Sequence, residues 1–101
     1  MKKKNICFAV NTFEQAMKVI KETKNRKLFS IPSIMTPTEA FAALDAGADA
    51  IKLFPAHIIT QQGLKSILAV LPNKTKIYVV GGIETEDIVS WLISGAFGFG
   101  I

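Results

Sequence analysis

The segment Asp49–Ala56 reads DAIKLFPA, an apolar and strand-like run that contains a single lysine. In a strand the side chains alternate between two faces, so Lys52 shares one face with Phe54. Ile51 and Leu53 then lie on the opposite face and pack on the protein interior. In low-dielectric surroundings a charged ammonium is disfavoured, and the neutral amine is a nucleophile able to form a Schiff base with a carbonyl. The alternative is a lysine whose head group extends from a strand end to water, which is common in short apolar runs.

Length and charge limit the class of protein. The chain has 101 residues, 50% of them hydrophobic, so we expect a single domain over residues 1–101 with one modest core. The net charge of +4 comes from scattered lysines and the Lys2–Lys4 start, without the interleaving of arginines and aromatics found on nucleic-acid platforms. No apolar run approaches the roughly 18 residues of a membrane span. We therefore expect a cytoplasmic protein that attracts anionic ligands and has no nucleic-acid or membrane partner.

The sequence offers little for a metal site or a disulfide. Cys7 is the only cysteine, and we interpret it as a small buried hydrophobe. His57 is the only histidine, and no carboxylate or second histidine stands at ligand spacing from it. We expect no metal and no cofactor, and we interpret His57 as a loop side chain. Trp91 stands at helical spacing from Ile88, which favours a place in the core.

Strand-like and helix-like segments alternate along the chain. The predicted strands are Asn5–Val10, Lys27–Ile31, the lysine segment, Lys76–Val80 and Ala96–Ile101. The predicted helices are Phe13–Lys24, Thr36–Gly47, Gly63–Val70 and Glu86–Ser94. The first is capped at Asn11–Thr12, the second by Thr36 with Pro37 and Glu39, and the last by Thr85. Pro32 marks the start of a loop over 33–35. The alternation predicts parallel strands joined by helical crossovers, hence an α/β sheet or barrel.

Three features fall at the carboxyl ends of predicted strands, where ligands bind in such folds. They are Pro32–Ser33, Lys52–Pro55 and Gly81–Gly82. The two glycines permit close approach of the backbone, and amides ahead of the next helix can hold a phosphate. An isolated pair of glycines is more typical of an ordinary turn, so its position at a strand end and the placement of Lys52 are what favour a binding role.

Several motifs together resemble one family. They are Thr36–Ala40, Ala43–Ala48, Ile51–Ala56, Val70–Pro72 and Val80–Ile83. This combination is similar to the 2-keto-3-deoxy-6-phosphogluconate aldolase family, and within it to the 2-keto-3-deoxy-6-phosphogalactonate branch. The resemblance implies a class I aldolase that is folded as a (β/α)8 barrel, works without a metal and is commonly trimeric. The implied reaction is reversible cleavage of a phosphorylated 2-keto-3-deoxy sugar acid to pyruvate and glyceraldehyde 3-phosphate.

The resemblance assigns roles to individual residues. Lys52 matches the catalytic lysine that forms the imine with the 2-keto carbon, and Phe54 matches the aromatic residue beside it. Pro32 corresponds to the proline after the preceding strand, and Thr36 to the threonine that opens the Thr-Pro helix. The Gly81–Gly82 pair corresponds to the first phosphate-binding loop. We therefore expect Pro32, Thr36, Phe54, Gly81 and Gly82 to bind substrate.

The chain also departs from this family. Ser33 stands where most members have glycine, and His57 stands where most have no histidine. The resemblance covers only strands four to eight of a barrel, so a partial barrel is expected, without the glutamate on an early strand that moves protons. Two alternatives stay open: a phosphate-binding barrel such as a thiamine phosphate synthase, which would share Gly81–Gly82 but need no Lys52, and a catalytically inactive fragment.

Overall fold

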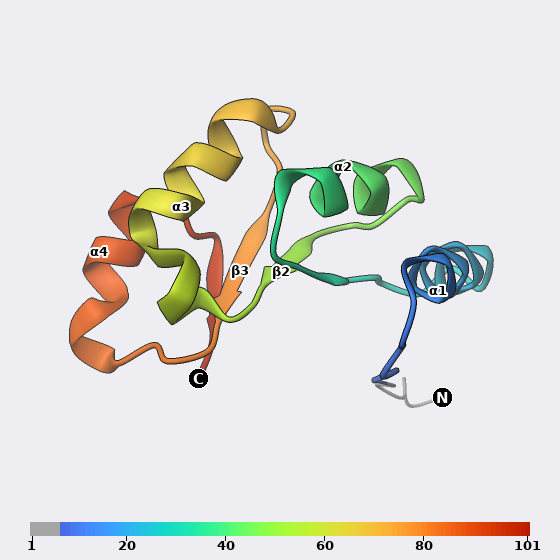
Figure 1. Cartoon of the computed structure of the whole chain (residues 1–101), viewed down its shortest axis with the longest axis horizontal. Helices are drawn as coiled ribbons and strands as arrows, with labels where there is room; N and C mark the ends of the chain where they lie inside the picture. Colours follow the sequence, from blue (N-terminus) through green and yellow to red (C-terminus); the bar gives the residue numbers. More distant parts are fainter. Residues whose placement is uncertain (1–6) are drawn as a thin grey trace.

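The computed structural model describes residues 7–101 and is an α/β fold (Figure 1). The strands are β1 (Ser33–Ile34), β2 (Ile51–Leu53), β3 (Ile77–Val80) and β4 (Gly98–Gly100). The helices are α1 (Phe13–Asn25), α2 (Pro37–Asp45), α3 (Ala56–Val70) and α4 (Ile88–Ile93), with a 3-10 turn η1 (Thr85–Asp87). The sheet has the order β1-β2-β3-β4, and every neighbouring pair is parallel. The α/β class and the parallel pairing are as predicted.

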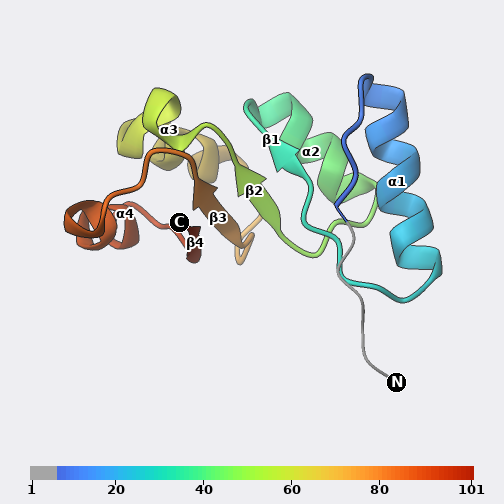
Figure 2. The same cartoon turned by 90° about the horizontal axis from the view of Figure 1, so that it is seen from below.

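One face of the sheet forms the centre of the core. The fully buried strand residues are Ile51, Leu53, Ile77 and Val79. The helix residues packed in the same cluster include Ile20, Ala40, Ala43, Leu64, Ile67 and Trp91. In Figure 2, α2 and α3 lie along one side of the strands. The alternate strand residues Lys52, Tyr78 and Val80 are only half-buried, so the opposite face of the sheet is more open than the core face.

The first two helices begin at threonine caps, as predicted. The Thr12 hydroxyl accepts a hydrogen bond of 3.1 Å from the amide of Gln15. At α2 the Thr36 hydroxyl accepts from the Glu39 amide at 3.2 Å, and the Glu39 carboxylate accepts from the Thr36 amide at 2.9 Å. These bonds occupy amide groups that the first turn of a helix leaves without a partner.

The prediction of a strand at Lys27–Ile31 is wrong. The strand is β1, at Ser33–Ile34, within the segment predicted as a loop. Pro32 precedes this strand instead of ending one, and its carbonyl accepts a 2.9 Å hydrogen bond from the Lys52 amide. Because β1 is an edge strand of the described sheet, the ladder does not need the N–H that proline lacks.

The first predicted strand, Asn5–Val10, lies partly outside the described residues. Its described part, 7–10, has no regular secondary structure, so the prediction is wrong there. Phe8 and Val10 are 61% and 40% exposed, and Cys7, predicted to be buried, is exposed. An apolar run forms a strand only where a neighbour completes its ladder, and nothing in residues 7–101 pairs with this segment.

Helix α3 begins earlier than predicted. It starts at Ala56, and its helical geometry is interrupted at Thr60, where φ is 71° and ψ is 168°. The Thr60 hydroxyl then accepts a hydrogen bond of 3.4 Å from the amide of Gly63, the residue at which the sequence predicted the helix to start. As a result His57 and Gln61–Gln62, predicted as loop residues, lie within α3.

The helix predicted at Glu86–Ser94 is divided. Thr85 opens the 3-10 turn η1 and makes no capping hydrogen bond, and α4 begins only at Ile88. The Gly81–Gly82 loop therefore leads into a 3-10 turn and not directly into an α-helix. A short α4 carries a weaker dipole than the longer helix that we expected to hold a phosphate at this loop.

An ion pair connects α1 with the start of β2. The Lys24 amine donates to both carboxylate oxygens of Asp49, at 2.9 and 2.7 Å, and to the carbonyl of Leu28 at 2.9 Å. The Ser30 amide also donates to Asp49, at 2.8 Å. Partial burial raises the pKa of Asp49, but the hydrogen bonds from Lys24 and Ser30 and the Lys24 charge outweigh it, so the pKa lies below its ordinary value.

We predict that Asp49→Asn lowers the free energy of unfolding by about 1 kcal/mol at neutral pH, because it removes the charged acceptor of the Lys24 and Ser30 hydrogen bonds. A lowered carboxyl pKa stabilises the fold above the ordinary value of about 4, and the contribution is lost as the pH falls through the lowered value. Urea unfolding at several pH values measures this difference, which should vanish in acid.

The matched control is Glu22→Gln, which breaks an exposed pair with Arg26 within one helix. Such pairs contribute about 0.3–0.5 kcal/mol, so this variant should unfold close to the unmodified chain. An Asp49→Asn variant as stable at neutral pH as Glu22→Gln would contradict the role given to the Lys24–Asp49 contact.

Candidate functional site

Lys52 lies in a row of residues that crosses the sheet. The strand register places Ser33 beside Lys52, Lys52 beside Tyr78, and Tyr78 beside Gly98. This row lies on the face that the helices leave open, where Ser33 is exposed and Lys52 and Tyr78 are half-buried. The amine therefore belongs to a strand on an open face of the sheet, with a hydroxyl-bearing residue in each neighbouring strand.

The Phe54 side chain connects Lys52 with the glycine loop. The Lys52 amine nitrogen lies 5.4 Å from the centroid of the Phe54 ring, within the range of a cation–π contact. The same ring packs against Gly81, where an added Cβ would lie 3.0 Å from the ring atoms Cδ2 and Cε2. Phe54 remains 48% exposed. The carboxyl ends of β2 and β3 thus bring Lys52, Phe54 and Gly81 together, which are three of the predicted site residues.

The Gly81–Gly82 loop contacts the first turn of α3. Gly81 and Gly82 have φ values of 101° and 70°, a region that residues with a side chain rarely adopt. The His57 amide donates to the Gly81 carbonyl at 3.1 Å, and the His57 ring atom Nδ1 lies 3.3 Å from the same oxygen. An added Cβ on Gly82 would lie 2.7 Å from Cβ of His57. The ring of His57 therefore packs directly against the loop.

The other two predicted site residues lie differently. Pro32 is next to Lys52 through the backbone, because its carbonyl accepts the Lys52 amide hydrogen bond. Thr36 opens α2, and its hydroxyl both accepts from the Glu39 amide and donates to the Glu39 carboxylate at 2.9 Å. The capping box thus occupies the Thr36 hydroxyl, and Thr36 makes no hydrogen bond to Lys52 within residues 7–101.

Sequence patterns did not predict which residue contacts the glycine loop or which residues stand beside Lys52 in the sheet. Ser33 and Tyr78 are its neighbours in the adjacent strands, which only the register reveals. The Tyr78 ring packs over Gly98, where a Cβ would lie 2.6 Å from Cδ1, and makes an edge contact with Phe97 at 5.5 Å between centroids. His57 was interpreted as a loop side chain, and no sequence signal links it to a glycine pair 24 residues away.

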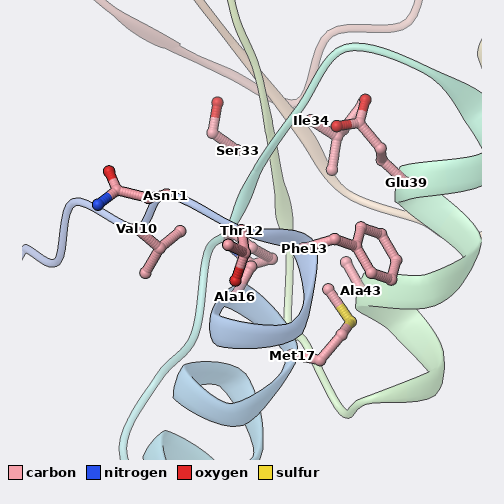
Figure 3. A pocket seen from close by; sticks show the side chains of 11 residues that line it. Val10, Asn11, Thr12, Phe13, Ala16, Met17, Ser33, Ile34, Glu39 and Ala43 are labelled. Carbon is pink, nitrogen blue, oxygen red and sulfur yellow. The ribbon is translucent and has the colours of Figure 1, made fainter.

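A pocket of about 240 Å³ lies between α1 and α2, and Pro32 and Ser33, the backbone neighbours of Lys52, are among its lining residues (Figure 3). Val10, Phe13 and Met17 also line it, together with Glu39. Most of these side chains are apolar, and the Glu39 carboxylate is engaged at the helix cap, so the pocket offers little for catalysis. Neither Lys52 nor the glycine loop lines it.

Residues 7–101 form neither a metal-binding cluster nor a helix long and apolar enough to cross a membrane. No group of three or more histidine, cysteine, aspartate or glutamate side chains in this range could hold a metal ion. None of the helices in the same range has both the length and the apolar character needed to cross a membrane.

Comparison with known proteins identifies the class to which this arrangement belongs. The family model "Aldolase: KDPG and KHG aldolase" matches residues 7–98, and the chain therefore belongs to the KDPG and KHG aldolase family. The 2-dehydro-3-deoxy-6-phosphogalactonate aldolase of Escherichia coli (strain K12) is 41% identical over 70 residues, covering 69% of this chain and 34% of that protein. A probable 2-dehydro-3-deoxy-6-phosphogalactonate aldolase of Rhizobium meliloti (strain 1021) is 36% identical over 83 residues, covering 82% and 39%.

Solved structures share the fold. One described as "Native KDPGal structure" matches with a TM-score of 0.83 and 31% identity, covering 91% of this chain and 53% of that one. A cube-shaped, highly porous protein cage designed by fusing symmetric oligomeric domains matches with a TM-score of 0.81 and 37% identity, covering 83% of this chain and 31% of that one. The chain thus spans 34% and 39% of the length of the two curated relatives.

We predict that Gly81→Ala destabilises the chain by about 1–3 kcal/mol through backbone strain, and by about a further 1 kcal/mol because the new methyl group meets the Phe54 ring and the Pro55 backbone. Gly47→Ala is the matched control, since Gly47 has a similar φ of 107° but its added Cβ would meet only aliphatic atoms of Lys24, at 3.2 Å and beyond, and no ring or backbone atom. Urea unfolding of both variants measures the difference. Equal losses of unfolding free energy in Gly81→Ala and Gly47→Ala would show that the Phe54 contact does not constrain Gly81.

Proposed function

We propose that this chain is part of a class I, Schiff-base aldolase of the phosphogalactonate type. Its reaction would be reversible cleavage of 2-keto-3-deoxy-6-phosphogalactonate, or the gluconate epimer, to pyruvate and glyceraldehyde 3-phosphate. The observation that carries the proposal is the position of Lys52, on the open face of a parallel sheet beside Phe54 and the glycine loop. The names of the curated relatives support the galactonate type.

In the proposed reaction the Lys52 amine is the catalytic group. The neutral amine attacks the 2-keto carbon, and loss of water gives an imine. Once protonated, the imine draws electrons from the bond between C3 and C4 of the substrate. This bond breaks as the hydroxyl on C4 gives up its proton, which releases glyceraldehyde 3-phosphate and leaves an enamine. Protonation of the enamine at C3 and addition of water then release pyruvate and restore the amine.

Other residues are proposed to bind the substrate around this amine. Phe54 would provide an apolar surface beside the imine, and Pro32 would lie next to it. The Gly81–Gly82 loop would hold the phosphate, and Thr36 would act through the start of α2. The family match favours this reading over a thiamine phosphate synthase-like enzyme, whose phosphate loop would not need Lys52.

We also propose that the sheet is a part of a (β/α)8 barrel, comparable to strands four to eight, and that the assembly is a homotrimer. The superposition on a chain of which this one covers 53% supports the partial barrel. Exposed apolar side chains on α4 support an interface between copies: Val89 at 65%, Leu92 at 50% and Ile93 at 76%.

We predict that sodium borohydride traps pyruvate on the 101-residue chain and that Lys52→Ala abolishes the trapping, because only an imine is reduced to a stable amine. Mass spectrometry of the digested protein locates the adduct. Lys76→Ala is the matched control, since Lys76 also lies over an aromatic ring, 5.2 Å from the centroid of Phe97. Adduct on the Lys52→Ala variant at the unmodified level would remove the basis of the proposal.

Turnover of the isolated chain should be no more than a trace. Positioned acids and bases contribute about 10²–10⁴-fold to such reactions, and the row around Lys52 contains no carboxylate within residues 7–101. Assays with the two phosphosugar acids test this expectation. Rates on the order of 1 s⁻¹ would mean that another group of this chain, or a second copy, performs the proton transfer.

A further inference from the structure

The Gly81 carbonyl is held by two donors of the same residue. The His57 amide donates to it at 3.1 Å, and the His57 ring atom Nδ1 lies 3.3 Å from it. A carbonyl oxygen only accepts hydrogen bonds, so Nδ1 donates to it in the tautomer that carries the proton on Nδ1. Because the ring also packs against Gly82, with Nδ1 2.9 Å from the position of a Cβ there, His57 restrains the peptide from two directions.

This contact determines where the Gly82 amide points. The only cis bond within residues 7–101 joins Phe54 and Pro55, so the Gly81–Gly82 peptide is trans and planar. In a trans peptide the N–H points opposite to the C=O, and the Gly82 N–H therefore points away from the first turn of α3. Within the described chain this N–H has no hydrogen-bond acceptor, and Gly82 is exposed. It is therefore available to a ligand.

A hollow lies beside the Gly81–Gly82 loop. The residues that line this hollow are Val80, Gly81, Gly82, Ile83, Glu84, Gly100 and Ile101, and none of their side chains carries an N–H donor. Glu84 is the one charged residue that lines it, and its carboxylate opposes an anion. An anion would bind here through backbone N–H groups, which makes their orientation decisive.

We propose that His57 is a positioning residue that holds the Gly81–Gly82 peptide with its Gly82 N–H directed at the phosphate of the substrate. The inference rests on the proposed function for the identity of the ligand, a phosphosugar acid, and adds a role for a residue outside the assigned site. His57 acts through the Gly81 carbonyl and need not contact the substrate itself.

The test is a titration of the isotope-labelled 101-residue chain with inorganic phosphate, followed by amide NMR at one pH and constant ionic strength. The two decisive variants are His57→Asn and His57→Leu, whose side chains have nearly the same shape. The Asn side chain retains an N–H donor near the position of Nδ1, and the Leu side chain has none. A third variant, Glu84→Gln, removes the opposing charge.

We expect a saturable shift of the Gly82 amide signal in the unmodified chain and in His57→Asn. His57→Leu should weaken phosphate binding about two- to tenfold, as one hydrogen bond is lost, and Glu84→Gln should strengthen it. If the ring had only a structural role, phosphate binding would be weakened equally in His57→Asn and His57→Leu.

Three results would overturn the proposal. They are a phosphate affinity unchanged in both His57 variants, an equal loss of phosphate affinity in both variants, and no phosphate-dependent shift of the Gly82 amide signal in the unmodified chain. None of them bears on the imine, because pyruvate carries no phosphate and borohydride trapping reports on Lys52 alone. If borohydride trapped no pyruvate but the Gly82 amide still shifted with phosphate, the proposed function would be contradicted. The role of His57 in anion binding would then be unaffected.

Discussion

Burial of one face of β2 and β3 is the constraint on which the rest of the structure depends. Ile51, Leu53, Ile77 and Val79 have no exposed surface, and fully burying such a side chain contributes about 1.5–3 kcal/mol. Since strand side chains alternate, this burial forces Lys52 to the opposite face. A one-residue slip of β2 would bury the amine among helices and expose two core side chains, so the register and the position of the lysine are secured together.

The carboxyl ends of the two central strands are coupled to each other. Phe54, just after β2, packs against Gly81, just after β3, and His57 in the next turn contacts the Gly81 carbonyl. Both contacts require glycine, because a methyl group at either position would meet a ring. The positive φ values in this loop therefore follow from its packing as well as from its turn. The same contacts hold the Lys52 amine and the candidate anion site next to each other.

The open face of the sheet is the second consequence of this architecture. Within the described chain the edge strands β1 and β4 each have a single neighbour, and the face that carries Lys52 has no covering layer. Such edges and half-buried faces favour association. In the partial barrel proposed above, further strands or another copy of the chain would cover this face.

The sequence by itself determined the α/β class, the parallel pairing, the capping of α1 and α2, and the face of Lys52, because periodicity and cap residues act locally. It misplaced β1, since a proline at an edge strand costs no ladder bond and only pairing with Lys52 reveals the strand. It also assigned Cys7 to a core that the described chain does not form there. Only the tertiary structure decided that Ser33 and Tyr78 are neighbours of Lys52 and that His57 meets the glycine loop. Those contacts join segments distant in the chain, and their register depends on packing that no local pattern encodes.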